Sequence, residues 1–222
     1  MTATPAADPV SAPSPAQKSS EKPGRASTVQ PVLEQLFQLY PHLFGAEFLP
    51  LKLGIFQDLM TLHPELFERD ALKAALGTHT RSTRYLQCVA AGKLRHDLQG
   101  LATESVAPEH VYFAVMELFR RRQARTQEDL QPKLRAQLIA AFERSGLTRQ
   151  DYLVKCQTND AQANLVLDEA LAERDRKLAK QDALVRTFES SGKSVAEFAD
   201  MYGLNPRDVS AALKSLGREV AR

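Results

Sequence analysis

The sequence predicts a mainly α-helical protein, with one small β-hairpin in its N-terminal half and an all-helical C-terminal region that contains a duplicated helix-turn-helix-like unit. Three observations lead to this prediction. Apolar residues recur at helical spacing through most of residues 31–123. From Gln127 onward, charged and helix-forming residues are dense and no strand pattern occurs. The same region contains a repeat at an offset of 46 residues.

The composition allows one or two globular domains and points to a local cationic patch. The chain has 222 residues, of which 43% are hydrophobic, and its formal net charge is only +2. Between positions 69 and 95, however, six basic residues stand against one acidic residue. A polyanion responds to such a patch even when the whole protein is nearly neutral. The basic residues are Arg69, Lys73, Arg81, Arg84, Lys93 and Arg95.

Several functional classes are disfavoured by the sequence. Cys88 and Cys156 are far apart and lack metal-ligand spacing, which favours a reducing, cytoplasmic setting. No apolar run approaches the ~20 residues that a membrane span needs, and the N-terminus does not resemble a secretory signal. Phosphate-loop, zinc-protease and serine-hydrolase motifs are missing. We therefore expect no enzyme, no metal, no cofactor and no membrane partner.

Composition divides the chain into three parts. Residues 1–30 are rich in Ala, Pro and Ser, so they are expected to form a disordered tail. Residues 31–126 are expected to form a folded domain, and residues 127–222 a separate helical region.

Helices are predicted throughout the folded domain. Apolar spacing predicts helices over Pro31–Tyr40, Gly54–Leu62 and Ala71–His79, the last capped by Asp70. A strong helical pattern begins at Pro108, because proline suits the first turn of a helix. This helix ends in a basic run, which the helix dipole alone partly explains. The run consists of Arg120, Arg121, Arg122 and Arg125.

The predicted β-hairpin follows the third helix. Tyr85–Val89 and Leu94–Asp97 are interpreted as two short strands. Gly92 lies between them and can adopt the positive φ that a hairpin turn requires.

The C-terminal region is interpreted as two repeat units, about 134–167 and 180–213. Each unit is expected to contain a helix that ends at glycine, a short helix, a turn near asparagine and a further helix. Val195–Leu213 therefore has helix-turn-helix character. A long helix of about 25–30 residues is predicted to connect the units, on the basis of an apolar stripe. The stripe comprises Leu167, Leu171, Leu178 and Val185.

Three ordered segments resemble the ProQ/FinO family of RNA-binding domains. Pro50–Leu59 (PLKLGIFQDL) is similar to the opening signature of the family, and Thr80–Leu86 (TRSTRYL) and Leu94–Gly100 (LRHDLQG) match two further segments. The resemblance covers roughly Pro31–Gln123. It implies a compact helical domain with a β-hairpin, in a bacterial RNA chaperone that binds a stem followed by a single-stranded 3′ tail. Such proteins protect small regulatory RNAs and promote their pairing with messages.

The resemblance also implies which residues bind RNA. Lys52, Lys73, Arg84, Tyr85 and Arg95 match basic and aromatic binding positions of the family, and Arg69 matches a basic position before the third helix. Arg81 and Lys93 complete the candidate set.

The resemblance also implies that different residues of this set contact different parts of the RNA. We expect Tyr85 and Arg95 to contact the 3′-terminal nucleotide, and Lys52, Arg69 and Lys73 to hold duplex phosphates. Three positions depart from the family pattern, because a basic or aromatic residue is common there. These are Gly77, Thr83 and Val115.

The sequence is compatible with two hypotheses about function. In the first, the protein is an RNA chaperone whose partners are small regulatory RNAs and the 3′ ends of messages. In the second, the C-terminal repeats form a DNA-binding or protein-assembly module. Homodimerisation, or contact with a protein partner, through the C-terminal helices is a further possibility.

Overall fold

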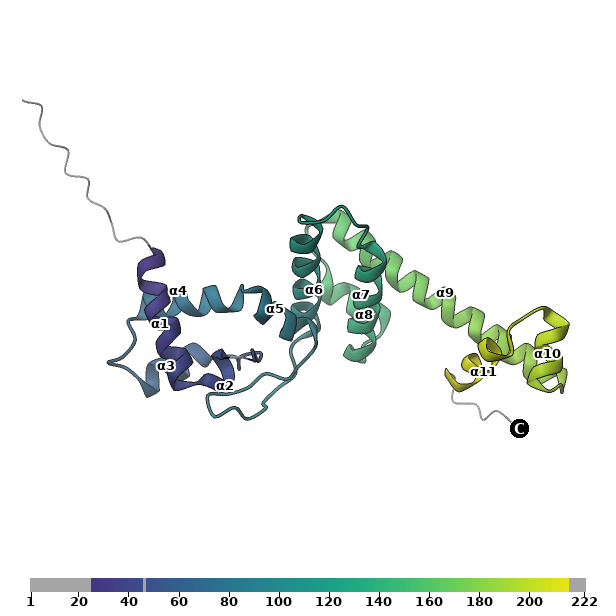
Figure 1. The fold of residues 1–222 in the computed structure, drawn as a ribbon, viewed down its shortest axis with the longest axis horizontal. Helices are drawn as coiled ribbons and strands as arrows, with labels where there is room; N and C mark the ends of the chain where they lie inside the picture. Colours follow the sequence, from purple (N-terminus) through teal and green to yellow (C-terminus); the bar gives the residue numbers. More distant parts are fainter. Residues whose placement is uncertain (1–24, 46, 216–222) are drawn as a thin grey trace, which may run out of the picture.

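The computed structural model describes residues 25–45 and 47–215. Within these ranges the chain is helical and contains no strand, and the helices form an elongated arrangement (Figure 1). The helices are α1 (Arg25–Leu39), α2 (Pro41–Phe44), α3 (Ile55–Leu62), α4 (Arg69–Thr80), α5 (Thr83–Ala90), α6 (Pro108–Gln123), α7 (Gln131–Ser145), α8 (Arg149–Cys156), α9 (Ala161–Ser191), α10 (Val195–Tyr202) and α11 (Pro206–Ser215).

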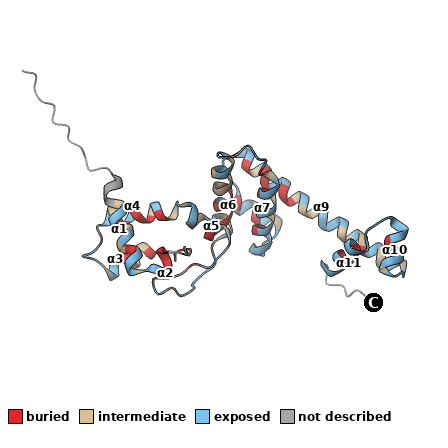
Figure 2. Cartoon of the chain, in the orientation of Figure 1, coloured by how far each residue is buried: buried red, intermediate tan, exposed pale blue. Residues whose placement is uncertain are grey.

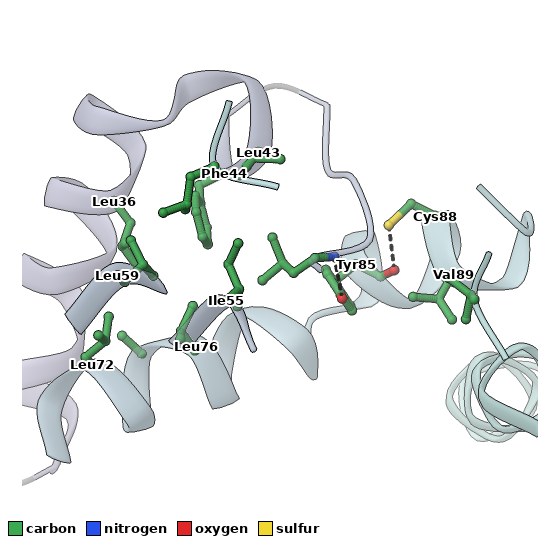
Figure 3. Close-up of a cluster of buried hydrophobic side chains, with 14 of the residues drawn as sticks. Leu36, Leu43, Phe44, Ile55, Leu59, Leu72, Leu76, Tyr85, Cys88 and Val89 are labelled. Atoms are coloured by element: carbon green, nitrogen blue, oxygen red, sulfur yellow. Dashed lines mark hydrogen bonds between the residues drawn. The ribbon is translucent and has the colours of Figure 1, made fainter. Parts of the chain in front are cut away.

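The first hydrophobic core lies among α1–α5 (Figure 3). Leu36 of α1, Leu59 of α3 and Leu72 of α4 are fully buried in it. Each of these side chains lies on the apolar face of an amphipathic helix, so the polar faces of the same helices remain in solvent. The predicted helices over Gly54–Leu62 and from Pro108 are confirmed by α3 and α6.

The predicted β-hairpin is wrong. Residues 83–90 form helix α5, because Ser82 caps it by accepting a hydrogen bond from the Tyr85 N–H at 3.2 Å. Tyr85, Cys88 and Val89 are all buried, at the i, i+3 and i+4 spacing of one helix face. Leu94–Asp97 forms no strand either, since only His96 makes isolated bridges, one to residue 51 and one to residue 102.

Two helix starts differ from the predictions. α1 begins at Arg25, so residues 25–30 are helical, and residues 1–24 of the predicted disordered tail lie outside the described residues. α4 begins at Arg69, and its cap is Glu68 rather than Asp70. The Glu68 carboxylate accepts hydrogen bonds from the N–H groups of Asp70 and Ala71, at 2.9 and 2.6 Å. These two capping hydrogen bonds to one carboxylate stabilise the first turn of the helix.

Helix α6 contributes to two cores. Val111 and Ala114 belong to the first core, whereas Tyr112, Val115 and Met116 pack in a second core with α7, α8 and the first half of α9. Because adjoining faces of one helix are buried in different clusters, α6 joins the N-terminal helices to the C-terminal region. Figure 2 shows buried residues along α6, α7 and the beginning of α9.

The predicted long connecting helix is confirmed by α9, which has 31 residues. Leu167 and Leu171 are buried in the second core, and Val185 is buried in a small third core with α10 and α11. Leu178, between them, is 37% exposed and belongs to neither cluster. The middle of α9 therefore spans from one core to the next (Figures 1 and 2).

Helix ends in the C-terminal region recur 46 positions apart. Gly146 and Gly192 both end a helix in the left-handed conformation, which glycine adopts at no steric cost. Thr148 and Ser194 then cap α8 and α10 through their hydroxyl oxygens. The duplication and its helix-turn-helix character stay a prediction.

Candidate nucleic-acid interface

Helix α4 carries a row of cations on its solvent side. Arg69, Lys73, Gly77 and Arg81 are spaced by four residues, so they are neighbours along one side of the helix. Arg69, Lys73 and Arg81 are exposed. The opposite side packs in the first core through Leu72, Ala75 and Leu76. The fold therefore uses the apolar face of α4 for packing and leaves its cations to solvent.

Arg81 places its charge beside Gly77. A Cβ at Gly77 would lie 3.2 Å from both terminal nitrogens of the Arg81 guanidinium. The guanidinium thus lies against the helix where residue 77 has no side chain. Gly77 is a position at which the ProQ/FinO resemblance leads us to expect a basic residue. Arg81, one turn further along the helix, supplies positive charge to the same place.

Two arginines lie over aromatic rings. The Arg84 guanidinium is 5.5 Å from the centre of the Phe48 ring, and that of Arg69 is 5.8 Å from the centre of the Phe56 ring. Cation–π contacts at these distances favour a fixed orientation of the guanidinium. Arg84 and Arg69 are therefore held in position although both are exposed.

We name Arg69, Lys73, Arg81 and Arg84 the α4–α5 face. In the described part of the chain, none of the four forms an ion pair with a carboxylate. Four arginines of the C-terminal region do so: Arg135, Arg149, Arg174 and Arg186. Unpaired, exposed cations on one surface are the arrangement that phosphate groups require.

Tyr85 and Arg95, by contrast, are buried in the fold. Only 7% and 8% of their surfaces are exposed. The Tyr85 hydroxyl accepts a hydrogen bond from the Leu51 N–H at 3.0 Å (Figure 3). Arg95 donates to the Leu51 carbonyl at 2.8 Å. Arg95 also donates to Nδ1 of His110 at 3.1 Å. Burial raises the pKa of Tyr85, so its hydroxyl stays neutral.

Lys52 and Lys93 lie apart from the α4–α5 face. The Lys52 ammonium is 2.8 Å from a carboxylate oxygen of Asp58, which raises the pKa of Lys52 through a hydrogen bond and charge attraction. This pairing neutralises much of the Lys52 charge. Lys93 is exposed in the turn after α5, at the opposite end of that helix from Arg84. Four of the eight candidate residues are thus exposed cations of α4 and the start of α5 that have no ion-pair partner among the described residues.

The end of α6 adds cations that the candidate set lacked. Arg121 donates to the backbone carbonyl of Arg81 at 2.9 Å and to the Thr83 hydroxyl at 3.3 Å. The basic run at this helix end therefore adjoins the junction of α4 and α5. The sequence signal was present, since four arginines occur within six residues. The helix dipole accounts for part of that run, so sequence spacing alone does not connect these arginines to the α4–α5 face.

The buried titratable groups near this face serve packing. His79 lies among the rings of Phe44, Phe48 and Tyr85, and burial lowers its pKa to about 4. Burial also raises the pKa of Cys88 to about 11, so its thiol is unreactive near neutral pH. Among the described residues, no group of three His, Cys, Asp or Glu side chains is placed to bind a metal ion. No helix in the same ranges is long and apolar enough to cross a membrane.

Comparison with known proteins identifies the N-terminal part. Residues 26–131 match the model of the ProQ/FINO family. The RNA chaperone ProQ of Shewanella pealeana is 35% identical over 113 residues, which cover 49% of each chain. The RNA chaperone ProQ of Shewanella piezotolerans is 39% identical over 84 residues, which cover 36% of this chain and 40% of the relative. The chain thus spans about half the length of the first curated relatives that it matches.

A solved structure is also similar. It is a FinO-like RNA chaperone from Neisseria meningitidis, with 29% sequence identity and a TM-score of 0.37. The match covers 40% of this chain and 92% of that one.

Residues 26–131 form a domain of the ProQ/FinO family. The curated relatives of this part of the chain are named RNA chaperones. The resemblance observed in the sequence is thereby confirmed.

Proposed function

We propose that this protein is an RNA chaperone that binds structured RNA through the α4–α5 face. The observation that carries the proposal is the set of four exposed, unpaired cations on this face, within a domain of the ProQ/FinO family. Phosphate neutralisation by Lys and Arg supplies most of the affinity of such interfaces. Two of the arginines are also oriented by aromatic rings, which reduces the entropy that binding must remove.

The preferred RNA in this proposal is a stem with a single-stranded 3′ tail, as at an intrinsic terminator. Arg69 and Lys73 hold phosphates of the duplex, while Arg81 and Arg84 lie at the end of α4 and the start of α5. A-form duplex RNA is recognised by its shape and backbone rather than by base sequence. The protein therefore selects structure, and it stabilises small regulatory RNAs and promotes their pairing with messages in the cytoplasm.

The predicted contact of Tyr85 and Arg95 with the 3′-terminal nucleotide stays a prediction. Both side chains bind the backbone of Leu51, so in the free protein the Tyr85 hydroxyl oxygen and one guanidinium nitrogen of Arg95 are engaged there. We infer that they act mainly by fixing residue 51 and its neighbours. Lys52 and Lys93 belong to the margin of the proposed interface, since Lys52 is paired with Asp58.

The domain division at residues 126 and 127 is part of the same proposal. α6 packs on both sides of this boundary, so the C-terminal helices are joined to the RNA-binding domain through a buried surface. DNA binding by the C-terminal repeats is the less favoured function. Residues 195–215 contain two basic residues, Arg207 and Lys214, against three carboxylates. Recognition helices usually carry a basic excess. Homodimerisation through the C-terminal helices stays a prediction, which sedimentation at two concentrations tests.

Binding of the whole protein to three nucleic acids tests the proposed function. They are a terminator hairpin with a U-tail, an unstructured RNA of equal length, and a DNA duplex of equal charge. We expect the hairpin to bind at least about tenfold more tightly than the other two. Equal affinity for the DNA duplex would contradict the proposal and favour the C-terminal alternative.

A further inference from the structure

A groove lies where the ProQ/FinO domain meets the C-terminal helices. It has a volume of about 680 Å³ and is formed by the start of α5, the end of α6 and the beginning of α7. We call it the junction groove. Its size falls within the range of small-molecule and nucleotide sites.

The junction groove is cationic. Arg121, Arg122, Arg125 and Lys133 line it, and Glu128 is the single acidic residue of the lining. Lys133 is paired with Glu128 at 2.6 Å, and Arg121 with Glu117 of α6 at 2.8 Å.

Two of these cations are available for a ligand. Arg122 and Arg125 are exposed, and their guanidinium groups form no hydrogen bond or ion pair in the described part of the chain, although Arg122 is attracted to Glu128 by charge. Arg122 lies in the last turn of α6 and Arg125 in the turn that follows it, where the Arg125 N–H donates to the Arg122 carbonyl at 3.0 Å.

The groove also offers apolar and amide groups. Leu118, Phe119, Leu130 and Leu134 supply an apolar surface, while Gln87 and Gln137 supply amides. Guanidinium groups match phosphate oxygens, apolar and aromatic side chains accept the face of a base, and amides hydrogen-bond to base edges. This combination fits an unpaired nucleotide better than an acidic peptide, which needs no surface for a planar ring.

The junction groove is continuous with the α4–α5 face. Thr83, in its lining, precedes Arg84 of that face in the chain. Arg121 in the groove donates to the carbonyl of Arg81. Gln87 lies one turn along α5 from Arg84, on the same side of the helix. An RNA strand that leaves the α4–α5 face at Arg84 therefore reaches the junction groove directly.

We propose that the junction groove binds an unpaired RNA segment adjoining the duplex that the α4–α5 face holds. Arg122 and Arg125 contact its phosphates, and a base packs against Phe119 and Leu118. This inference rests on the proposed function, because the α4–α5 face must bind the duplex part of the same RNA. It adds residues from beyond the α4–α5 region, including α7, to the interface.

The test uses the whole protein with Arg122→Ala and Arg125→Ala combined. Neither guanidinium forms a hydrogen bond or an ion pair, and Arg122 interacts with Glu128 through charge alone, so we expect the variant to keep the fold, which circular dichroism and urea unfolding verify. The RNAs are one hairpin in three forms: blunt, with a 5′ tail, and with a 3′ tail. The matched control is Lys177→Ala with Lys180→Ala, which removes two exposed charges from the middle of α9.

We expect the groove variant to bind at least one tailed hairpin about tenfold more weakly, because two charge-assisted contacts are lost. Binding of the blunt hairpin changes less than about twofold, as it does for the control variant. A photoreactive 4-thiouridine in the affected tail crosslinks to residues 118–137 of the parent protein.

Equal losses on blunt and tailed hairpins would overturn the inference, because they would show general charge attraction only. Unchanged binding of every hairpin would overturn it as well. If RNA binding is unchanged but the variant no longer binds polyglutamate that the parent binds, the groove is a protein site instead. Failure of the parent protein to bind any hairpin would contradict the proposed function itself, so the two failures are distinguishable.

Discussion

Tyr85 and Arg95 bind the two polar backbone groups of a single residue, Leu51. Tyr85 accepts from its N–H at 3.0 Å and Arg95 donates to its carbonyl at 2.8 Å. These residues come from α5 and from the segment after it, so they tie two parts of the domain to the loop before α3. Loss of RNA binding in a variant of either residue can therefore come from a lost contact with RNA or from a destabilised fold. A measurement of folding stability separates the two.

Tyr85→Phe should lower the free energy of unfolding by about 1–3 kcal/mol, because it leaves the buried Leu51 N–H without an acceptor. Urea unfolding of the parent and variant proteins measures this. Tyr202→Phe is a suitable control, since Tyr202 is 53% exposed. Unchanged stability of Tyr85→Phe, together with a large loss of RNA affinity, would show that the hydroxyl serves RNA rather than Leu51.

Gly77→Ala should increase stability and weaken RNA binding at the same time. Alanine is better than glycine in a helix interior by about 1 kcal/mol. Its Cβ, however, displaces the Arg81 guanidinium, which lies 3.2 Å from that position. We expect affinity for a terminator hairpin to fall about twofold to fivefold, in line with one weakened phosphate contact. In an Arg81→Ala background, Gly77→Ala should have no further effect on affinity. A further loss of affinity in that background would show that Gly77 acts independently of Arg81.

The salt dependence of RNA binding should report how many cations of the α4–α5 face contact phosphate. Removing one phosphate contact is expected to reduce the slope of log K against log salt by about 1 unit or less. Arg69→Ala and Lys73→Ala should each show such a reduction, measured by titration at several salt concentrations. Lys52→Ala should show a smaller one, because Lys52 is paired with Asp58. Equal slopes for all three variants would contradict this ranking.

His79 should make folding stability depend on pH. Burial lowers its pKa to about 4 in the folded protein, from an ordinary value of 6.5. Between these values the unfolded chain binds a proton that the folded protein does not, so stability is full above pH 6.5 and is lost as pH falls toward 4. From pH 7 to pH 5 the expected loss is about 2 kcal/mol.

His79→Phe isolates this contribution from the carboxylates, because the phenyl ring suits the surrounding aromatic side chains. We expect the difference in unfolding free energy between pH 7 and pH 5 to shrink by about 2 kcal/mol in the variant. An identical pH dependence in the parent and variant proteins would show that His79 titrates normally.

The helices of the first domain were predictable because their apolar spacing is regular, as in α3 and α6. The strand prediction for Tyr85–Val89 is wrong because a segment of five residues is too short to distinguish the period of a strand from that of a helix. The deciding signal was Ser82, whose hydroxyl caps the helix. The start of α4 was misplaced for a related reason, since Glu68 supplied the cap that Asp70 was expected to supply.

The cations of the candidate site could be identified from the sequence, but their arrangement in space could not. Lys73 was expected on the solvent side of the helix over Ala71–His79, which α4 confirms, whereas Arg69 was expected before that helix and is its first residue. It did not reveal that Arg95 is buried against Leu51, or that Lys52 pairs with Asp58, because these contacts depend on tertiary packing. The junction groove could not be predicted from the sequence for the same reason, since its walls come from three helices.

The most direct test of the central claim is a charge-matched comparison on a terminator hairpin with a U-tail. One variant combines Arg69→Ala, Lys73→Ala and Arg84→Ala, and the other combines Arg176→Ala, Lys177→Ala and Lys180→Ala on exposed positions of α9. Both lose three positive charges. We predict that the first variant binds at least about thirtyfold more weakly than the parent and that the second stays within about threefold. Equal losses for the two variants, with both folded, would contradict RNA binding through the α4–α5 face.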